Sequence, residues 1–291
     1  MVEASAEVIP VRMEDGTGSS ITVYIPEKCG KDAPVFICMP AMGIAARYYE
    51  PLAAPFAEKG WILVTADLRG LGFSSVRVSA ATDFGYHEMV MYDWPAIASA
   101  VRTRFAGNPV FFLGHSMGGQ LSCLFLSACP EAGDGLVLVA APSVYYRGWN
   151  FPQSWGVLAG TAIAKRLAVF LGYFPGKKLG FGQTEAKTMI RDWANQARTG
   201  LYRPAKSPLD FESLLAALEK PVLAFSFKGD FLAPRRSVRN LCAKMSRARI
   251  THIHLDAEGL DHFNWVRNSR PVRDHIGQWL DGGKKIKTRL S

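Results

Sequence analysis

Short apolar runs alternate along the chain with longer helical patterns, and this alternation restricts the fold more than any other feature. The predicted strands are Ile21–Ile25, Val35–Met39, Trp61–Ala66, Val110–Leu113, Leu136–Ala140, Val222–Phe227 and Ile250–Leu255. The predicted helices are Arg47–Glu58, Glu88–Arg104, Met117–Cys129, Arg235–Met245 and Pro271–Leu280. Several strands are continuously apolar, as expected when both faces are covered. The pattern predicts an α/β fold with a mostly parallel, doubly wound sheet.

The alternation stops between Ser143 and Lys220, where no strand is predicted. This segment is rich in tryptophan and tyrosine, and Trp155–Leu171 has an apolar helical pattern. We expect an inserted helical cap at 143–220 on a core formed by 1–142 and 221–291.

Composition is that of an ordinary folded protein, with 48% hydrophobic and 20% charged residues in 291. We expect no membrane span, because no run approaches the roughly 18 to 20 apolar residues required. The N-terminus does not resemble a signal peptide. The five cysteines are odd in number and irregularly spaced, which favours reduced thiols and a cytoplasmic location.

The formal net charge is +9, and part of it comes from a basic tail. The tail residues are Lys284, Lys285, Lys287 and Arg289. They form either a solvated terminus or a contact with a polyanion or membrane surface. No nucleic-acid motif accompanies the charge, so we expect no nucleic-acid partner. The sequence leaves the oligomeric state open, a homodimer included.

Strand Val110–Leu113 leads into Gly114-His115-Ser116-Met117-Gly118-Gly119, and a helix follows at once. This is G-x-S-x-G between a strand and a helix, the setting of a nucleophile elbow. The residues two before and two after the serine must lack bulk, because strand and helix nearly touch there. The motif predicts Ser116 as a catalytic nucleophile above the carboxyl edge of the sheet.

A serine hydroxyl needs a base within hydrogen-bond reach, and four histidines follow Ser116. His262 lies in a loop just beyond the last predicted strand, where such a base is expected. His252 and His254 share one face of a strand and are expected to be structural rather than a metal pair. His275 lies within the last helix, where packing is expected. We predict His262 as the base.

With a nucleophile turn of this kind, the three catalytic residues occur along the chain in the order Ser, Asp or Glu, and His. The acid that orients the base is therefore expected between Ser116 and His262. Asp230 comes directly after strand Val222–Phe227, at the same sheet edge as the His262 loop. Its rivals are Asp256 and Asp261. We predict Asp230, because a carboxylate there can fix the tautomer of His262.

Acyl transfer also needs backbone N–H donors for the developing oxyanion. One should be the N–H of Met117, at the start of the helix after the nucleophile. The other should come from Pro40-Ala41-Met42-Gly43, and we choose Met42, which lies just past the strand and is followed by a glycine.

These residues match the α/β-hydrolase superfamily, and the resemblance covers nearly the whole chain. Asp67-Leu68-Arg69-Gly70-Leu71-Gly72-Phe73-Ser74 is similar to the superfamily's D-x-R-G-x-G-x-S turn, which shapes the fold. The cap segments Leu171–Gly180 and Arg191-Asp192-Trp193 resemble a bacterial branch known as predicted α/β hydrolases, often labelled serine aminopeptidase-like. The chain departs from many members at Pro40-Ala41, where they carry His-Gly.

The function expected from these residues is hydrolysis of an ester, thioester or lactone through an acyl-Ser116 intermediate. The expected partner is a small-molecule acyl substrate. The triad needs no metal and no cofactor. One alternative is an acyltransferase that uses the same triad, and another is a ligand receptor or lyase on this scaffold.

The cap aromatics suggest the substrate class. Five of them are expected to roof an apolar acyl pocket, namely Tyr145, Tyr146, Trp149, Trp155 and Trp193. The alternative is that these side chains only attach the cap to the core.

Overall fold

An eight-stranded sheet forms the centre of the structure, a computed structural model that describes residues 4–290, with side chains through Gly282. Its strands are β1 (Ala4–Arg12), β2 (Gly18–Pro26), β3 (Val35–Met39), β4 (Ile62–Ala66), β5 (Val110–His115), β6 (Gly135–Val139), β9 (Pro221–Phe227) and β10 (Arg249–Leu255). The strand order is β1-β2-β4-β3-β5-β6-β9-β10, and β2 is antiparallel to both of its neighbours, β1 and β4, while all other neighbouring pairs are parallel. The predicted mostly parallel α/β sheet is confirmed.

All seven predicted strands are present, with ends shifted by a few residues. The sequence prediction missed β1, which pairs with β2 at the edge of the sheet. Most β1 side chains are exposed, so the strand lacks the apolar run by which the buried strands were recognised.

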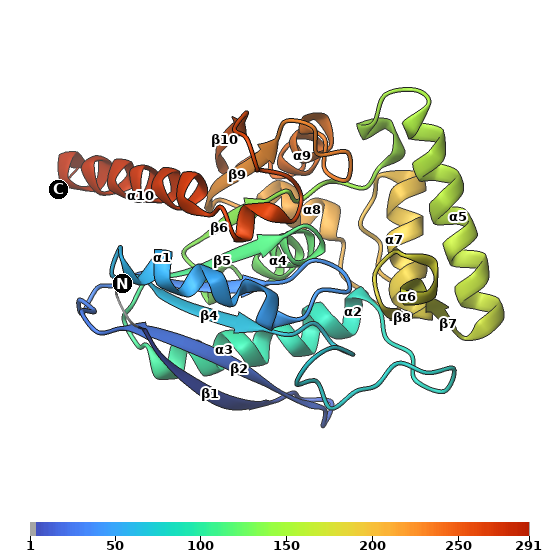
Figure 1. Cartoon of the computed structure of the whole chain (residues 1–291), viewed down its shortest axis with the longest axis horizontal. Coiled ribbons are helices and arrows are strands. Elements are labelled where there is room, and N and C mark those ends of the chain that lie inside the picture. The colour runs from blue at the N-terminus through green and yellow to red at the C-terminus, as the bar shows by residue number, and fades with distance from the viewer. Residues whose placement is uncertain (1–3, 291) are drawn as a thin grey trace.

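Helices cover both faces of the sheet (Figure 1). The core helices are α1 (Ala53–Ala57), α3 (Trp94–Arg104), α4 (Met117–Ala128), α8 (Phe211–Ala217), α9 (Arg235–Cys242) and α10 (Arg270–Leu290). Helix α1 packs against α10, while α4 packs against α3 and α8. The central strands β3 to β6 are fully buried between these layers, as their apolar sequences predict.

Two predicted helices are irregular. Residues Arg47–Glu58 were predicted as one helix, but a 3-10 helix η1 (Ala46–Leu52) precedes α1. Residues Glu88–Arg104 comprise the end of α2 (Tyr86–Glu88), a π-helical turn η2 (Met89–Asp93) and α3. Apolar periodicity does not distinguish these helix types, because all of them bury one face.

The segment between β6 and β9 forms a separate group of elements at the end of the sheet toward which the central strands point (Figure 1). It contains η4 (Tyr146–Gly148), α5 (Gln153–Leu171), β7 (Tyr173–Pro175), α6 (Gly176–Leu179), β8 (Thr184–Ala186) and α7 (Lys187–Thr199). Strands β7 and β8 pair as a hairpin. The expectation of no strand here was wrong, because three-residue strands are too short to show a period.

Buried polar contacts attach α7 to the core. Asp192 accepts hydrogen bonds from the backbone N–H groups of Tyr86 and Ala205, at 3.1 and 2.9 Å. Thr188 bonds to the carboxylate of Asp83 at 2.7 Å. The end of the cap at Lys220 stays a prediction. Helix α8 lies inside the predicted cap range but packs against α4 of the core.

The sequence was also expected to contain no apolar segment of membrane-spanning length, and α5 corrects this. It has 19 residues, and an 18-residue window of it has a mean hydropathy of 1.3, so the helix is long and apolar enough to cross a membrane by length and composition. Thr161, Ala164 and Ala168 are nevertheless buried, and the helix packs against α7 and β7. The helix does not show as an unbroken apolar run in the sequence, because Lys165 and Arg166 interrupt it.

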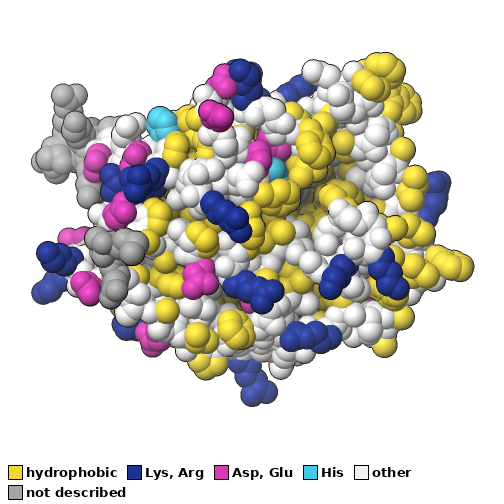
Figure 2. Space-filling view, in the orientation of Figure 1, with side chains coloured by type: hydrophobic (Ala, Val, Ile, Leu, Met, Phe, Trp, Pro, Cys, Tyr) yellow, Lys and Arg dark blue, Asp and Glu magenta, His cyan; other side chains and the backbone are white. Residues whose placement is uncertain are grey.

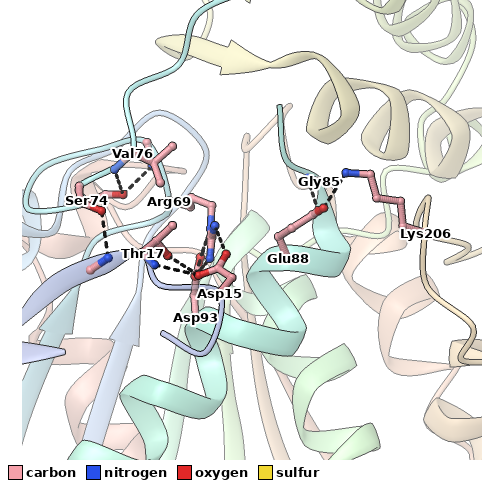
Figure 3. A network of polar contacts seen from close by, with 12 residues as sticks. Asp15, Thr17, Arg69, Ser74, Val76, Gly85, Glu88, Asp93 and Lys206 are labelled. Atoms are coloured by element: carbon pink, nitrogen blue, oxygen red, sulfur yellow. Dashed lines mark hydrogen bonds and ion pairs between the residues drawn. The ribbon is translucent and has the colours of Figure 1, made fainter. Parts of the chain in front are cut away.

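The D-x-R-G-x-G-x-S turn is held by its charged residues. Asp67 accepts the N–H groups of Ala46 and Phe73, at 2.7 and 3.0 Å. The guanidinium of Arg69 is buried, and its Nε lies 3.1 Å from both carboxylate oxygens of Asp93 while Nη1 bonds Asp15 (Figure 3). Burial raises the pKa of Asp93 to about 6, although Arg69 opposes this rise. The turn therefore has the structural role that its resemblance implied.

The basic tail belongs to the last part of α10. The backbone of α10 runs to Leu290, past the predicted end at Leu280. The side chains of Lys284, Lys285, Lys287 and Arg289 lie outside the described residues.

Replacing Arg69 by leucine should destabilise the fold, because Asp93 would remain buried without its partner. We expect a loss of about 3–5 kcal/mol in the free energy of unfolding. The matched control is Arg104→Leu, whose pair with Glu7 is about half exposed and should cost under about 1 kcal/mol. Urea denaturation at pH 7 measures both, and equal losses would contradict this role for Arg69.

Candidate active site

Ser116 lies at a strained turn between β5 and α4. Its φ of 52° and ψ of −116° fall outside the regions favoured by L-residues. A Cβ at Gly114 would lie 2.3 Å from the Cα of Gly119, and one at Gly118 would lie 2.2 Å from the carbonyl oxygen of Met39. Both glycines are therefore required by close backbone approach, as the motif predicted.

The structure brings together the three predicted triad residues. The Oγ of Ser116 lies 3.1 Å from Nε2 of His262, and Nδ1 of His262 lies 2.9 Å from Oδ2 of Asp230. The other carboxylate oxygen of Asp230 accepts the N–H groups of Leu232 and Ala233, both at 2.9 Å. Asp230 and His262 are buried. The carboxylate is thus fixed by the loop after β9, and it can hold the imidazole with Nε2 toward the serine.

The rival acids do not reach His262. Asp256 pairs with Lys228 at 2.7 Å, and both side chains are about two-thirds exposed. Asp261 accepts the backbone N–H groups of Phe263 and Asn264, at 2.8 Å each. Asp261 therefore orders the turn after His262 rather than the histidine itself.

The other late histidines occupy packing positions. Ser226 Oγ lies 2.9 Å from Nε2 of His252 and 2.9 Å from Nδ1 of His254. Burial, and then Arg235, lowers the pKa of His252 to about 4. The ring of His275 packs against Phe225. Within the part of the chain that the structure describes, no three His, Cys, Asp or Glu side chains are grouped to hold a metal ion.

Two backbone N–H groups near Ser116 are available to an oxyanion. Met117 is the first residue of α4, and no acceptor among the described residues takes its N–H. The N–H of Ala41 donates to the hydroxyl of Tyr49 at 2.9 Å, whereas that of Met42 has no such acceptor among the described residues. The N–H of Gly118 donates to the carbonyl of Pro40 at 3.0 Å, which holds this loop against the start of α4.

Two tyrosines of η1, which the sequence analysis missed, join the loops of the site. The hydroxyl of Tyr49 lies 2.7 Å from Nδ1 of His115, the residue before the nucleophile. The same hydroxyl accepts the N–H of Ala41, so Tyr49 joins the oxyanion loop to the residue before the nucleophile. Burial, and then the charge of His262, holds the pKa of His115 well below its usual range, so the ring stays neutral. Tyr48 donates to the carbonyl of Phe263 at 3.0 Å, beside His262.

A sequence signal for these tyrosines existed. The pair Tyr48-Tyr49 follows the oxyanion loop by a few residues. It lies within the predicted helix Arg47–Glu58, and the helical pattern alone gives no reason to place its hydroxyls at the site.

A cavity of about 420 Å³ lies between the oxyanion loop, η1 and the cap hairpin. Its lining includes Gly43, Ile44, Arg47, Tyr48, Leu71 and Lys177. Gly43 follows the candidate donor Met42 in the chain, and Tyr48 bonds the loop of His262, but none of the triad side chains is part of the lining.

Four of the five cap aromatics pack in two pairs. Trp149 and Trp193 pack with Val144 in a small second core, and the indole N–H of Trp149 donates to the carbonyl of Phe231 at 2.6 Å. Tyr145 and Tyr146 are half-buried and pack edge to face. This packing favours a role for Trp149 in attaching the cap to the core. Its hydrogen-bond partner, Phe231, directly follows Asp230 in the chain.

Trp155 is different, because 62% of its side chain is exposed. It was predicted to roof the acyl pocket, and this stays a prediction, since Trp155 is not among the side chains that line the cavity beside the oxyanion loop. Aromatic content alone did not reveal which face of α5 carries it.

Comparison with known proteins agrees with this fold. Residues 31–199 match the family described as "Serine aminopeptidase, S33", which covers more than half of the chain and includes Ser116. Asp230 and His262 lie beyond the matched segment, so their assignment depends on geometry. Protein abhd-3.2 of Caenorhabditis elegans is 26% identical over 137 residues, which cover 45% of this chain and 36% of that protein.

Two solved structures have the same overall fold. DcsB in complex with its substrate analogue has a TM-score of 0.66 at 16% identity, covering 96% of this chain and 99% of that one. An esterase of Pyrococcus furiosus has a TM-score of 0.62 at 14% identity, covering 96% and 91%. The chain belongs to the α/β-hydrolase superfamily, within the family described as serine aminopeptidase S33.

Proposed function

We propose that this protein hydrolyses a carboxylic ester, thioester or lactone through an acyl-Ser116 intermediate. The observation that carries the proposal is the hydrogen-bonded chain from Ser116 through His262 to Asp230, held at a strained nucleophile turn. Membership of a hydrolase family supports the reaction class. The esterase among the structural neighbours agrees with it at the level of fold.

In the proposed first step, Oγ of Ser116 attacks the carbonyl carbon as Nε2 of His262 takes the hydroxyl proton. The carbonyl oxygen becomes an oxyanion that accepts the N–H groups of Met117 and Met42. Asp230 stabilises the imidazolium through Nδ1. The oxyanion then collapses, the bond to the leaving oxygen or sulfur breaks, and His262 returns the proton to that atom.

Deacylation reverses these roles. His262 removes a proton from water, the resulting hydroxide attacks the acyl carbonyl, and the proton passes to Oγ of Ser116 as the acid leaves. These steps use only side chains and backbone groups of this chain. An acyltransferase would replace water by an acceptor alcohol, and analysis of products with and without added alcohols separates the two reactions.

The cap supports an apolar, uncharged substrate rather than a peptide amine. Between Gly135 and Thr184 the chain contains no Asp or Glu. An aminopeptidase needs an anionic group to hold the substrate ammonium, and Glu185, the first acid of the cap, is buried with its pKa raised by burial. Two cations, Arg47 and Lys177, line the cavity beside the oxyanion loop, where they would repel a substrate ammonium.

Ser116→Ala should abolish turnover of a p-nitrophenyl ester while leaving the thermal unfolding transition in place, because it removes only the nucleophile. A fluorophosphonate probe should label the wild type at Ser116 alone. Ser127→Ala, on the same helix with its hydroxyl bonded to Leu124, is the matched control and should still be labelled. Labelling that persists in Ser116→Ala would show that Ser116 is not the nucleophile.

Asp230→Asn should lower kcat by about 10⁴-fold, because the amide would favour the wrong tautomer of His262. Asp256→Asn should change kcat little, since that carboxylate pairs with Lys228 at the surface. Steady-state kinetics of both variants test which carboxylate orients His262. A larger loss in Asp256→Asn would show that Asp230 is not the orienting acid.

Medium-chain and aromatic acyl esters should be preferred over acetate. Each buried methylene contributes about 0.8 kcal/mol, so kcat/KM should rise about fourfold per methylene until the pocket is full. A p-nitrophenyl ester series measured below micelle formation tests this. Equal kcat/KM for acetate and octanoate contradicts an apolar pocket, and efficient cleavage of aminoacyl amides would favour a peptidase instead.

A further inference from the structure

Exposed apolar side chains are concentrated in the cap. Of the twelve large apolar side chains that are exposed among the described residues, eight lie between Phe151 and Phe181. The most exposed are Phe170 at 87%, Phe151 at 80% and Trp155 at 62%. Figure 2 shows hydrophobic side chains along the edge of the molecule where α5 lies in Figure 1. A concentration of this kind on a folded chain indicates an interaction surface.

Helix α5 has two distinct faces. Thr161, Ala164 and Ala168 recur every three or four residues and are buried. Trp155, Ile163 and Phe170 recur every seven or eight residues on the opposite side and are exposed. Because the first face is packed against α7 and β7, α5 presents its second face outward while the cap stays folded.

The charge of this region is of one sign. From Gly135 to Thr184 there is no Asp or Glu, and the cations are Arg147, Lys165, Arg166, Lys177 and Lys178. Arg166 is exposed on α5 itself, and Lys177 and Lys178 are exposed on α6. Apolar and aromatic side chains flanked by cations are typical of helices that lie in the interface of an anionic bilayer.

The same charges argue against a second copy of the chain as the occupant. A twofold dimer through this face would bring identical patches together. Each patch would place its cations near those of its partner, and the stretch from Gly135 to Thr184 of either copy has no acid to neutralise them. Anionic lipid headgroups supply the missing negative charge.

We propose that the exposed face of α5, together with Phe151 and the lysines of α6, docks on the surface of an anionic phospholipid bilayer. The helix lies in the plane of the interface with Trp155, Ile163 and Phe170 among the acyl chains. Arg166, Lys177 and Lys178 contact the headgroups. This docking does not depend on the proposed hydrolysis, so the Ser116→Ala protein docks equally well.

Flotation of the full chain with large unilamellar vesicles tests the proposal. The protein should float with phosphatidylcholine vesicles that contain phosphatidylglycerol, bind pure phosphatidylcholine much more weakly, and dissociate as salt is added. Phe170→Ser should weaken binding about tenfold, and Lys178→Gln about fivefold. Phe73→Ser is the matched control, since Phe73 is also exposed but lies outside the cap, and its binding should not change.

An unchanged thermal unfolding transition in each variant shows that any loss of binding is local. Absence of binding to the anionic vesicles, or equal losses for Phe170→Ser and Phe73→Ser, would overturn the proposal. A wild-type dimer in sedimentation that Phe170→Ser dissociates, without vesicle binding, would assign this face to a second copy and overturn it as well.

Discussion

Close backbone contact at the turn between β5 and α4 is the constraint on which the candidate site depends. The N–H of Gly118 donates to the carbonyl of Pro40, and the space that a side chain at Gly114 would need is filled by Gly119. This contact holds Ser116 in a conformation that an isolated turn would not keep. It also brings the loop after β3 to the start of α4, so that the nucleophile and both candidate oxyanion donors are positioned by the same packing.

The remaining site residues follow from parallel strands ending at one edge of the sheet. The loops after β9 and β10 carry Asp230 and His262, and adjacent parallel strands place these loops together. Tyr48 and Tyr49 of η1 then connect the loops, one bonding the segment after His262 and the other bonding both His115 and the oxyanion loop. The ordering of the site therefore depends on hydrogen bonds between segments that are distant in the chain, in addition to the sheet.

The sequence predicted the fold and the positions of the triad because these features have local signals. Buried parallel strands are continuous apolar runs, and the nucleophile turn needs glycine at fixed offsets from Ser116. Edge strand β1 was missed because most of its side chains are exposed. His115 and Tyr49 could not be paired, since 66 residues separate them. The exposure of Trp155 could not be predicted, because the aromatic content of a helix does not reveal which face it buries.

The central claim of this account is a covalent acyl enzyme on Ser116, formed by His262 and Asp230 acting together. The most direct measurement is rapid acid quench after mixing with p-nitrophenyl octanoate, followed by mass spectrometry of the peptide that contains Ser116. We predict a burst of p-nitrophenol accompanied by an octanoyl mass increase on Ser116. Turnover of the ester with no octanoyl adduct on that serine at any quench time, or an adduct on another side chain, would contradict the account.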